Sequence, residues 1–405
     1  MFIELHIIQN FAPANLNRDD SGSPKECEFG GVRRARISSQ SFKRAIRFEP
    51  VFEETTKVEN GRRTKFIADQ ITKRLVEADK DKEEARAVAE AFADSYAGGL
   101  DKKTGKTNVL IYLSKEEFDG IAQKLLADWD TALAEAASKG KQKIIGDLIK
   151  ALVKETKDRT GAPDIALFGR MLASKAELNI DAACQVAHAI STHRVAMEWD
   201  YFTAVDDFKP DDTSGAGMVG YTGYNSSCFY RYARIDWQQL KENLGWRDEN
   251  KAKKAAEKAL IQQGNQDAVV LARRTVEGFL RAAIDAIPTG KQNAFAAQNP
   301  TNMALAVVRT DGKCWNLSNA FEIPIRSERR SSDDETTYTG YIAPSIAALD
   351  EEWNDKISFY DDAQVRAVSV YADRRHQEAL KTLKPHLQAT MSAWVNRVTD
   401  ALPQE

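Results

Sequence analysis

The first strand expected in this sequence is apolar on both of its faces, which restricts the folds open to the chain. Within residues 2–8 every odd-numbered position is Ile or Leu, and the even-numbered face begins with Phe2 and ends with Ile8. Successive side chains of a strand point to opposite faces. A strand of this kind needs cover on both sides, so we expect it in a sheet that lies between other layers.

Residues 63–157 change the pattern from strands to successive amphipathic helices. Three apolar stripes recur there at three- and four-residue spacing, which is the period of one helix face. They consist of Phe66, Ile67, Ile71 and Leu75; of Phe118, Ile121, Leu125, Leu126 and Trp129; and of Ile144, Ile145, Leu148, Ile149 and Leu152. We expect a helical subdomain inserted after the first strand–helix unit.

The remaining sequence mixes strands and helices and predicts an α+β core with insertions. A Gly-rich, acidic and aromatic stretch over 198–223 favours a long exposed loop or hairpin. We expect strands over 227–235, 303–309 and 364–371, and helices over 182–192, 251–287 and 377–402, the last interrupted at Pro385.

The overall charge excludes a generally polycationic protein. The 405 residues contain 57 Lys and Arg against 60 Asp and Glu, a formal net charge of −3, which still permits a local basic strip. The sequence shows no apolar stretch of about 20 residues that would span a membrane, and its start does not resemble a signal peptide. The four cysteines never form Cys-x-x-Cys. We therefore expect a cytoplasmic protein with reduced thiols and with no metal or cofactor.

Residues 33–47 form a purely basic segment, with six Lys or Arg residues and no acidic one. Ser38 or Ser39 would cap a helix there, leaving backbone N–H groups at its start for an anion. Lys43 and Arg47 are four residues apart and would share one face of that helix. Arginine, serine and helix N–H groups suit phosphate, so the segment predicts a phosphate-binding site. A solvated basic face is the alternative.

Two further polar segments allow either a binding role or an ordinary structural one. Residues 287–295 combine a turn with Lys291, two amides and an aromatic ring, which suits phosphate and one stacked base. A plain helix-to-strand connection explains them equally well. Residues 166–171 place Arg170 beside a glycine, and a helix end packed on the core is the simpler interpretation there.

No enzyme motif in the sequence is complete. Residues 105–107 end like a P-loop but lack its upstream glycine and a preceding strand. His188 and His193 are five residues apart and lack the glutamate of a zinc-protease motif, so we assign each a core or surface role. Asp19 and Asp20 could hold Mg²⁺, although adjacent acids in turns are usually solvated or capping groups.

Several motifs taken together resemble one known family. The first block reads Leu-Asn-Arg-Asp-Asp at 16–20 and Phe-Gly-Gly-Val-Arg-Arg-Ala-Arg-Ile-Ser-Ser-Gln-Ser-Phe-Lys-Arg-Ala at 29–45. Further matches follow in order at 164–171, 187–193, 202–207, 229–233, 291–292 and 319–322. On these residues the chain resembles the CasC family, the backbone subunits of the type I-E CRISPR surveillance complex Cascade. The resemblance spans most of the chain.

The resemblance implies a fold like a right hand, with an RRM-like (ferredoxin-like) palm, a large helical fingers insertion and a protruding thumb loop. It assigns residues 1–59 to the first part of the palm, 60–180 to the fingers, 181–197 to a palm helix, 198–226 to the thumb and 227–405 to the second part of the palm. It implies a non-catalytic subunit whose copies form a filament along guide RNA, kink it periodically and present its bases to target DNA, beside other Cascade subunits.

The resemblance also implies which residues contact the guide. Ser38, Gln40, Lys43 and Arg47 would hold its phosphates, and Met171 would fill the gap left by a flipped base. Residues of the thumb would wedge between bases of guide and target, namely Phe202, Thr203 and Val205. The complete expected RNA-binding set is Arg18, Lys25, Arg33, Arg34, Arg36, Ser38, Gln40, Lys43, Arg44, Arg47, Arg170, Met171, Lys291 and Gln292.

Two regions depart from the family pattern. Residues 60–160 share little with it beyond amphipathic helices, and residues 326–362 are longer and more charged, which favours a surface loop. One alternative function remains on sequence grounds. Related filament subunits of type III systems cleave bound target through a loop aspartate, so Asp19 or Asp20 would here make the chain a metal-dependent ribonuclease acting on guide-bound target.

Overall fold

The structure is a computed structural model that describes residues 1–404 except 102, 139–142, 157–158, 173–175, 205–217, 252–254, 328, 333–334 and 362. Its internal contacts divide the chain into two compact units. Unit 1 comprises Met1–Phe52, Gln185–Ile235 and Val276–Pro403, and unit 2 comprises Glu53–Cys184, Asp236–Thr275 and Gln404–Glu405. Within the described ranges, every helix is too short or too polar to cross a lipid bilayer.

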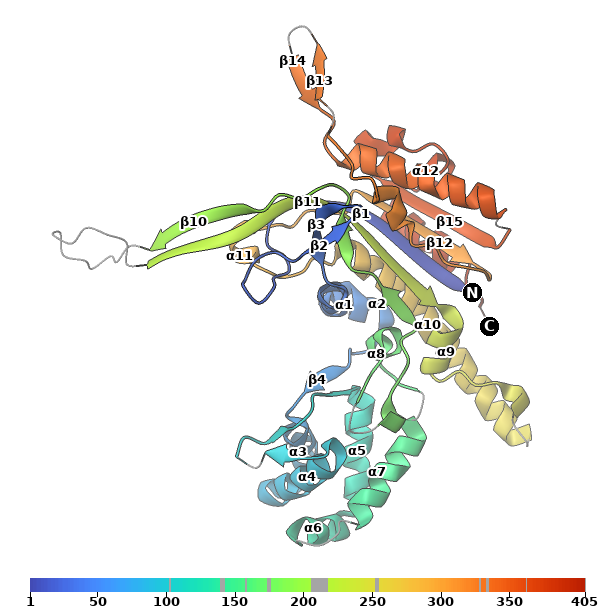
Figure 1. Cartoon of the computed structure of the whole chain (residues 1–405). Helices are drawn as coiled ribbons and strands as arrows, with labels where there is room; N and C mark the ends of the chain where they lie inside the picture. Colours follow the sequence, from blue (N-terminus) through green and yellow to red (C-terminus); the bar gives the residue numbers. More distant parts are fainter. Residues whose placement is uncertain are drawn as a thin grey trace, which may run out of the picture. The chain divides into compact units, whose positions relative to one another are not determined.

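Unit 1 is organised around a nine-stranded sheet (Figure 1). The strands are β1 (Phe2–Ala14), β2 (Glu26–Phe29), β3 (Val32–Ile37), β8 (Cys184–Val186), β9 (Ala189–Ser191), β10 (Glu198–Ala204), β11 (Met218–Asp236), β12 (Met303–Arg309) and β15 (Val365–Ala372). The main path runs β15-β12-β1-β11-β9-β3-β2, and β8 and β10 also pair with β11. β12 is antiparallel to both of its neighbours, β1 and β15.

Both faces of β1 are covered, which confirms the expectation from its alternating sequence. On one face Ile8 belongs to an apolar cluster with Ile346 of α12 (Ile342–Tyr360). On the other face Leu5 lies near Phe42 of α1 (Ser39–Phe48) and Phe279 of α10 (Ala255–Asp285). The sheet is therefore sandwiched between α12 on one side and α1 with the C-terminal half of α10 on the other.

The other elements of unit 1 follow the sheet or its edges. They are α11 (Gln292–Phe295), the 3₁₀ turns Leu317–Phe321, Arg374–Ala379 and Lys384–His386, the hairpin β13 (Arg329–Ser332) and β14 (Glu335–Tyr338), and α13 (Met391–Thr399). The indole of Trp394 in α13 donates to the carbonyl of Ser369 in β15 at 3.1 Å, which anchors the helix to the sheet. The hairpin β13–β14 lies in the charged stretch 326–362.

Unit 2 is mainly helical. Its elements are β4 (Arg62–Thr64), α3 (Ile67–Glu77), α4 (Lys82–Ala97), β5 (Leu100–Asp101), β6 (Lys106–Thr107), β7 (Ile111–Leu113), α5 (Lys115–Ala127), α6 (Trp129–Ala137), α7 (Lys143–Thr156), α8 (Pro163–Phe168), α9 (Trp237–Asn243), the first part of α10 and the 3₁₀ turns Ala176–Leu178 and Glu249–Lys251. The predicted stripes lie in α3, α5 and α7, where Ile71, Phe118 and Ile145 meet in one apolar core. Trp129, expected in the second stripe, instead begins α6 and joins the same core. Phe66, by contrast, precedes α3 and is exposed.

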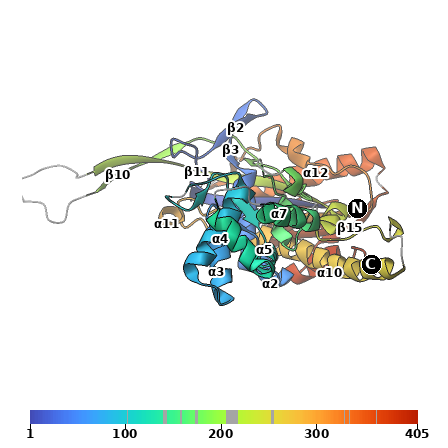
Figure 2. The same ribbon diagram turned by 90° about the horizontal axis from the view of Figure 1, so that it is seen from below.

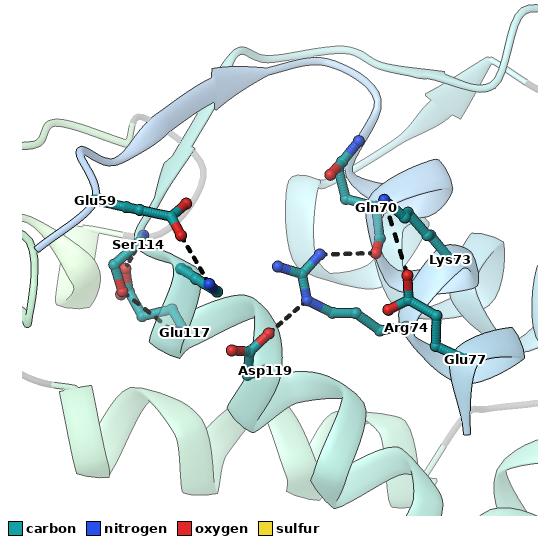
Figure 3. Close-up of polar contacts among 9 residues, drawn as sticks. Glu59, Gln70, Lys73, Arg74, Glu77, Ser114, Glu117 and Asp119 are labelled. Atoms are coloured by element: carbon teal, nitrogen blue, oxygen red, sulfur yellow. Dashed lines mark hydrogen bonds and ion pairs between the residues drawn. The ribbon is translucent and has the colours of Figure 1, made fainter. Parts of the chain in front are cut away.

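Polar contacts between α3 and α5 orient these two helices beside the core (Figure 3). Arg74 of α3 donates to the carboxylate of Asp119 in α5 at 2.7 Å and to the carbonyl of Gln70 at 3.0 Å. At the start of α5, Ser114 and Glu117 form a capping box, in which each side chain accepts from the other residue's backbone N–H. The helix therefore begins at a position that its own sequence determines.

Two predicted helices are wrong. Residues 182–192, within the palm helix expected over 181–197, form β8 and β9 instead. Ile190 pairs with Tyr230 of β11 and with Arg36 of β3, so sheet pairing overrides the weak helical preference of this short segment. The closing helix expected over 377–402 is confined to α13, because residues 374–390 fold as two 3₁₀ turns with extended connections.

Candidate nucleic-acid interface

Helix α1 lies at the centre of the basic segment, and its start is fixed by local capping. Ser38 is extended (φ −68°, ψ 145°), and its hydroxyl oxygen accepts from the N–H of Ser41 at 3.3 Å. The N–H of Ser38 in turn donates to the side chain of Asn17 at 2.8 Å. Phe42 and Ile46 are buried against the sheet. The polar face of α1 is consequently directed away from the core.

That polar face presents some of the predicted phosphate ligands and buries others. Gln40 and Arg44 are exposed and Lys43 is half-buried, and their three- and four-residue spacing places them on one side of α1. Arg47 is only 5% exposed and its guanidinium lies 5.4 Å from the ring of Phe48. On α1, the side chains within reach of a polymer are therefore Gln40, Lys43 and Arg44.

The loop between β1 and β2 is attached to β3 by a backbone bond and to the start of α1 by the side chain of Asn17. The N–H of Lys25 donates to the carbonyl of Asn17 at 2.9 Å, and the N–H of Arg36 donates to the carbonyl of Lys25 at 2.8 Å. Arg18 is exposed on this loop, and Lys25 and Arg36 are half-buried. The amide of Asn15 donates to the carbonyls of Gly22 at 3.0 Å and Gly223 at 2.9 Å, which ties the loop to β11.

A turn before α11 completes this surface. Gly290 packs so closely that a Cβ there would lie 2.3 Å from the carbonyl oxygen of Leu16, so only glycine fits. The adjacent Lys291 ammonium donates to the hydroxyl of Thr222 at 3.1 Å. Gln292 instead donates to the carbonyl of Pro288 at 3.1 Å and so stabilises its own turn. Lys291 belongs to the surface, and Gln292 shapes the turn that carries it.

Strands β10 and β11 extend beyond the rest of the sheet as a two-stranded hairpin in both views (Figures 1 and 2). Phe202 and Thr203 are exposed on β10, and Phe202 lies opposite Gly220. Val205 falls outside the described residues. The hairpin carries a set of exposed large apolar side chains, namely Trp199, Tyr201, Phe202, Met218, Val219 and Tyr221. Such a set on a projecting element favours insertion into a partner over burial in the chain's own core.

We use the name basic face for the group Arg18, Lys25, Arg36, Gln40, Lys43, Arg44 and Lys291. Its members come from three separate segments that are hydrogen-bonded to one another or to the base of the hairpin within unit 1. Arg33 is exposed on β3 but lies 4.0 Å from the carboxylate of Glu26, an exposed pair of small energetic weight. Cations and amides in this arrangement suit a polyanion whose sequence is not read.

Two arginines of the predicted RNA-binding set take structural roles instead. Arg34 is fully buried and donates to backbone carbonyls, including those of Thr192 at 2.8 Å and Phe321 at 2.7 Å. In unit 2 the buried Arg170 donates to the carboxylate of Glu117 at 2.6 Å and to the carbonyl of Leu178 at 2.9 Å. Buried arginines of this kind hold loops in place, because each carbonyl would otherwise lack a partner.

Met171 follows the buried Arg170 and is 85% exposed. It lines a depression of about 560 Å³ in unit 2 together with Arg63, Tyr112 and Ile180. The backbone of Arg170 pairs with that of Ile180, with both N–H···O distances at 2.9 Å. The anchored arginine and this bridge therefore hold the methionine side chain in an outward position.

The carboxylates proposed for metal-dependent cleavage do not form a site. Asp19 accepts from the N–H of Ser21 at 2.9 Å, its hydroxyl at 2.7 Å and the N–H of Ser23 at 3.0 Å. These bonds, the Ser21 hydroxyl first, lower the pKa of Asp19. In the part of the chain that the structure describes, three His, Cys, Asp or Glu side chains nowhere gather closely enough to hold a metal ion. The geometry offers Asp19 a turn-forming role.

Sequence reasoning missed three residues that shape this surface. Asn15 and Asn17 join the loop to β11 and to α1, and His188 lies at the start of α1, where its ring accepts from the N–H of Ser39 at 3.2 Å. The two asparagines carry no charge, and the one signal near them in the sequence is the frequency of Pro, Asn, Asp and Gly over residues 13–31, which is typical of a loop. His188 lies within the family motif 187–193, which matched without suggesting a role.

Comparisons with known proteins agree with this architecture. No curated protein matches the chain. A chain of a solved structure described as a CRISPR RNA-guided surveillance complex, pre-nicking, is 28% identical with a TM-score of 0.78, over 99% of this chain and 100% of that one. A chain of a second, described as a CRISPR RNA-guided surveillance complex, is 25% identical with a TM-score of 0.66, over the same shares. The model of the CT1975-like proteins matches residues 3–397, and the chain belongs to that family, in agreement with its resemblance to CasC.

Proposed function

We propose that this chain is a non-catalytic, guide-RNA-binding subunit of a CRISPR surveillance complex of type I-E. The observation that carries the proposal is the basic face, which joins three segments of unit 1 beside the exposed hairpin. Cationic side chains bind phosphates without regard to sequence, which leaves the base edges free to pair with target DNA. The likeness to chains of RNA-guided surveillance complexes supports this function.

An RRM-like palm is supported by the order of the central strands. The strands β12-β1-β11-β9, with α1 following β1 and α10 following β11, give the βαββαβ succession of a ferredoxin-like fold. An RRM binds RNA bases on the free face of its sheet. Here α12 covers that face, and Tyr230 and Tyr232 on it are buried. RNA is therefore held by the loops and α1 at the sheet's edge, which is the basic face.

The second part of the proposal is that the hairpin β10–β11 kinks the guide RNA. Phe202 and Thr203 on β10 would enter between bases and kink the guide at intervals, as copies of the chain stack into a filament with the other subunits. An inserted aromatic side chain recovers about 1–3 kcal/mol per base by stacking, which offsets part of the cost of unstacking. Exposure of six large apolar side chains on one hairpin supports this role.

The proposal is tested by removing two charges from the basic face. In Lys43→Ala with Arg44→Ala, affinity for RNAs of unrelated sequence should fall equally. The slope of log affinity against log salt should become shallower by about 1–2, because fewer counterions are released. Arg44 is chosen for this variant, and not Arg47, because Arg47 is buried.

A matched control removes the same charge from unit 2. Lys73→Ala with Lys150→Ala deletes two exposed lysines that pair with acids of their own helices at 3.8 Å and 2.9 Å. It should leave both the affinity and the salt slope unchanged. The proposal is wrong if the α1 double variant copurifies with normal amounts of guide RNA and keeps the wild-type slope.

A further inference from the structure

The ring of His188 lies between α1 and β3 in unit 1. Its Nδ1 accepts from the N–H of Ser39, the first residue of α1, at 3.2 Å. The guanidinium of Arg36 lies 3.3 Å from the same nitrogen. The residue is exposed, unlike His193, which is 4% exposed. His188 therefore reaches solvent from the place where the basic face meets the start of α1.

These contacts determine the protonation state of the ring. A backbone N–H and a guanidinium are donors only, so Nδ1 must be the acceptor and the single ring proton sits on Nε2. Partial burial, followed by the positive charges of Arg36 and Lys25, lowers the pKa of His188. The ring is neutral at pH 7 and carries an N–H donor on Nε2. In the part of the chain that the structure describes, both hydrogen-bond contacts of His188 are made by Nδ1.

We propose that the Nε2–H of His188 donates a hydrogen bond to a phosphate oxygen of the guide RNA, as a neutral donor beside the basic face. The inference rests on the proposed function. Ser39 is only 9% exposed, and its N–H donates to the imidazole of His188. This bond polarises the ring, so the N–H on Nε2 becomes a stronger hydrogen-bond donor at the N-terminus of α1. Phosphate oxygens accept such bonds strongly.

The competing interpretation is that His188 only positions Arg36 and α1. Two substitutions separate the roles, because asparagine and glutamine each reproduce one ring nitrogen. His188→Asn keeps an acceptor for the N–H of Ser39 but is too short to reach a phosphate. His188→Gln places an amide N–H near the position of Nε2 and loses the Nδ1 acceptor. If contact with RNA is the role, His188→Gln keeps most of the affinity and His188→Asn loses it.

The measurement is the affinity of each variant for two RNAs of unrelated sequence over a range of salt concentrations. We expect His188→Asn to weaken the binding of both RNAs by about tenfold or more, since the lower limit for a hydrogen bond to a charged acceptor corresponds to a factor of about ten. The salt slope should stay at the wild-type value, because a neutral donor releases no counterion. Nitrogen NMR of the free protein should show a protonated Nε2 and an unprotonated Nδ1 at pH 7.

Three results would overturn the inference: wild-type affinity for His188→Asn, a loss confined to His188→Gln, or a doubly protonated ring at pH 7. Failure of this inference is distinct from failure of the proposed function. In the first case Lys43→Ala with Arg44→Ala still binds weakly with a shallower slope. In the second case that double variant also binds like the wild type.

Discussion

At the scale of single residues, the face of β1 that α12 covers contains an unusual amount of buried polar chemistry. Glu4 pairs with Arg309 and also accepts from the N–H of Trp315 at 2.5 Å, while the guanidinium of Arg309 lies 4.0 Å from the indole of Trp315. Burial raises the pKa of Glu4. Each charge is paired, which is the condition under which buried charges are tolerated.

His6 lies on the same face and predicts a pH dependence of stability. It is fully buried, its Nδ1 is 2.9 Å from the hydroxyl of Tyr230, and burial lowers its pKa from 6.5 to about 3. Between these values the unfolded chain binds a proton that the folded chain does not, so stability is complete above pH 6.5 and falls as the pH decreases. From pH 6.5 to pH 5 the free energy of unfolding should drop by about 2 kcal/mol on account of His6.

Urea unfolding at a series of pH values checks this prediction. In His6→Asn the slope of the unfolding free energy against pH should decrease by about one proton between pH 6.5 and pH 5. His386→Asn, at a half-buried position, is the control and should retain most of the slope. An unchanged slope in His6→Asn would contradict the assignment.

The sequence predicted where the basic chemistry lies but not which cations face solvent. Residues 33–47 contain Arg33 and Arg44, which are exposed, and Arg34 and Arg47, which are buried. Arg34 is drawn inward by carbonyls of Thr192 and Phe321, more than 150 residues away in sequence. No local pattern records such acceptors, so only the fold distinguishes a binding arginine from a structural one.

At the scale of elements, the hairpin β10–β11 depends on one glycine. Gly220 lies directly opposite Phe202, and a Cβ at Gly220 would lie 2.4 Å from the Cζ atom of the phenylalanine ring. The ring therefore rests over the glycine, which is how an aromatic side chain covers an exposed strand glycine. The direction in which Phe202 points is set from across the hairpin.

Gly220→Ala should displace the Phe202 ring without unfolding unit 1. We expect both Gly220→Ala and Phe202→Ala to reduce the unstacking of bound RNA. Phe202→Ala should lose about 1–3 kcal/mol of stacking free energy per contacted base. The readout is the fluorescence increase of 2-aminopurine placed at successive guide positions. Gly120→Ala in α5, where an added Cβ meets open space, is the matched control. A wild-type fluorescence pattern in Gly220→Ala would exclude this packing role.

Wholly apolar strands and long helices were predictable, and short elements were not. The strand at 303–309 appears as β12, in which every residue is buried, and the long helix within 251–287 appears as α10, which has 31 residues. Residues 182–192 read as a helix but form β8 and β9. Each of these strands has only three residues, so pairing with β11 and β3 decides their structure.

At the scale of the whole molecule, the two units have separate cores, and unit 2 contains a charged anchor of its own. Arg170 and Glu117 are both buried and bonded at 2.6 Å. Removing one partner of such a pair leaves a buried charge uncompensated and costs about 3–5 kcal/mol. The effect should be confined to the unit that contains the pair.

Arg170→Ala should therefore raise amide hydrogen exchange in α5, β7 and the segment around Met171 and leave β1, β12 and β15 of unit 1 unchanged. Lys150→Ala, which removes an exposed cation from α7 of the same unit, should change neither set. Equal acceleration throughout the sheet of unit 1 would contradict the independence of the two cores.

The most direct test of the central claim, that guide RNA lies on the basic face, is lysine acetylation followed by mass spectrometry, with and without bound RNA. Lys25, Lys43 and Lys291 should be protected by RNA of any sequence, and high salt should abolish the protection. Lys73 and Lys150 of unit 2, both highly exposed, should react at the same rate in both states. Unchanged reactivity of the three basic-face lysines in a protein with bound RNA would contradict the claim.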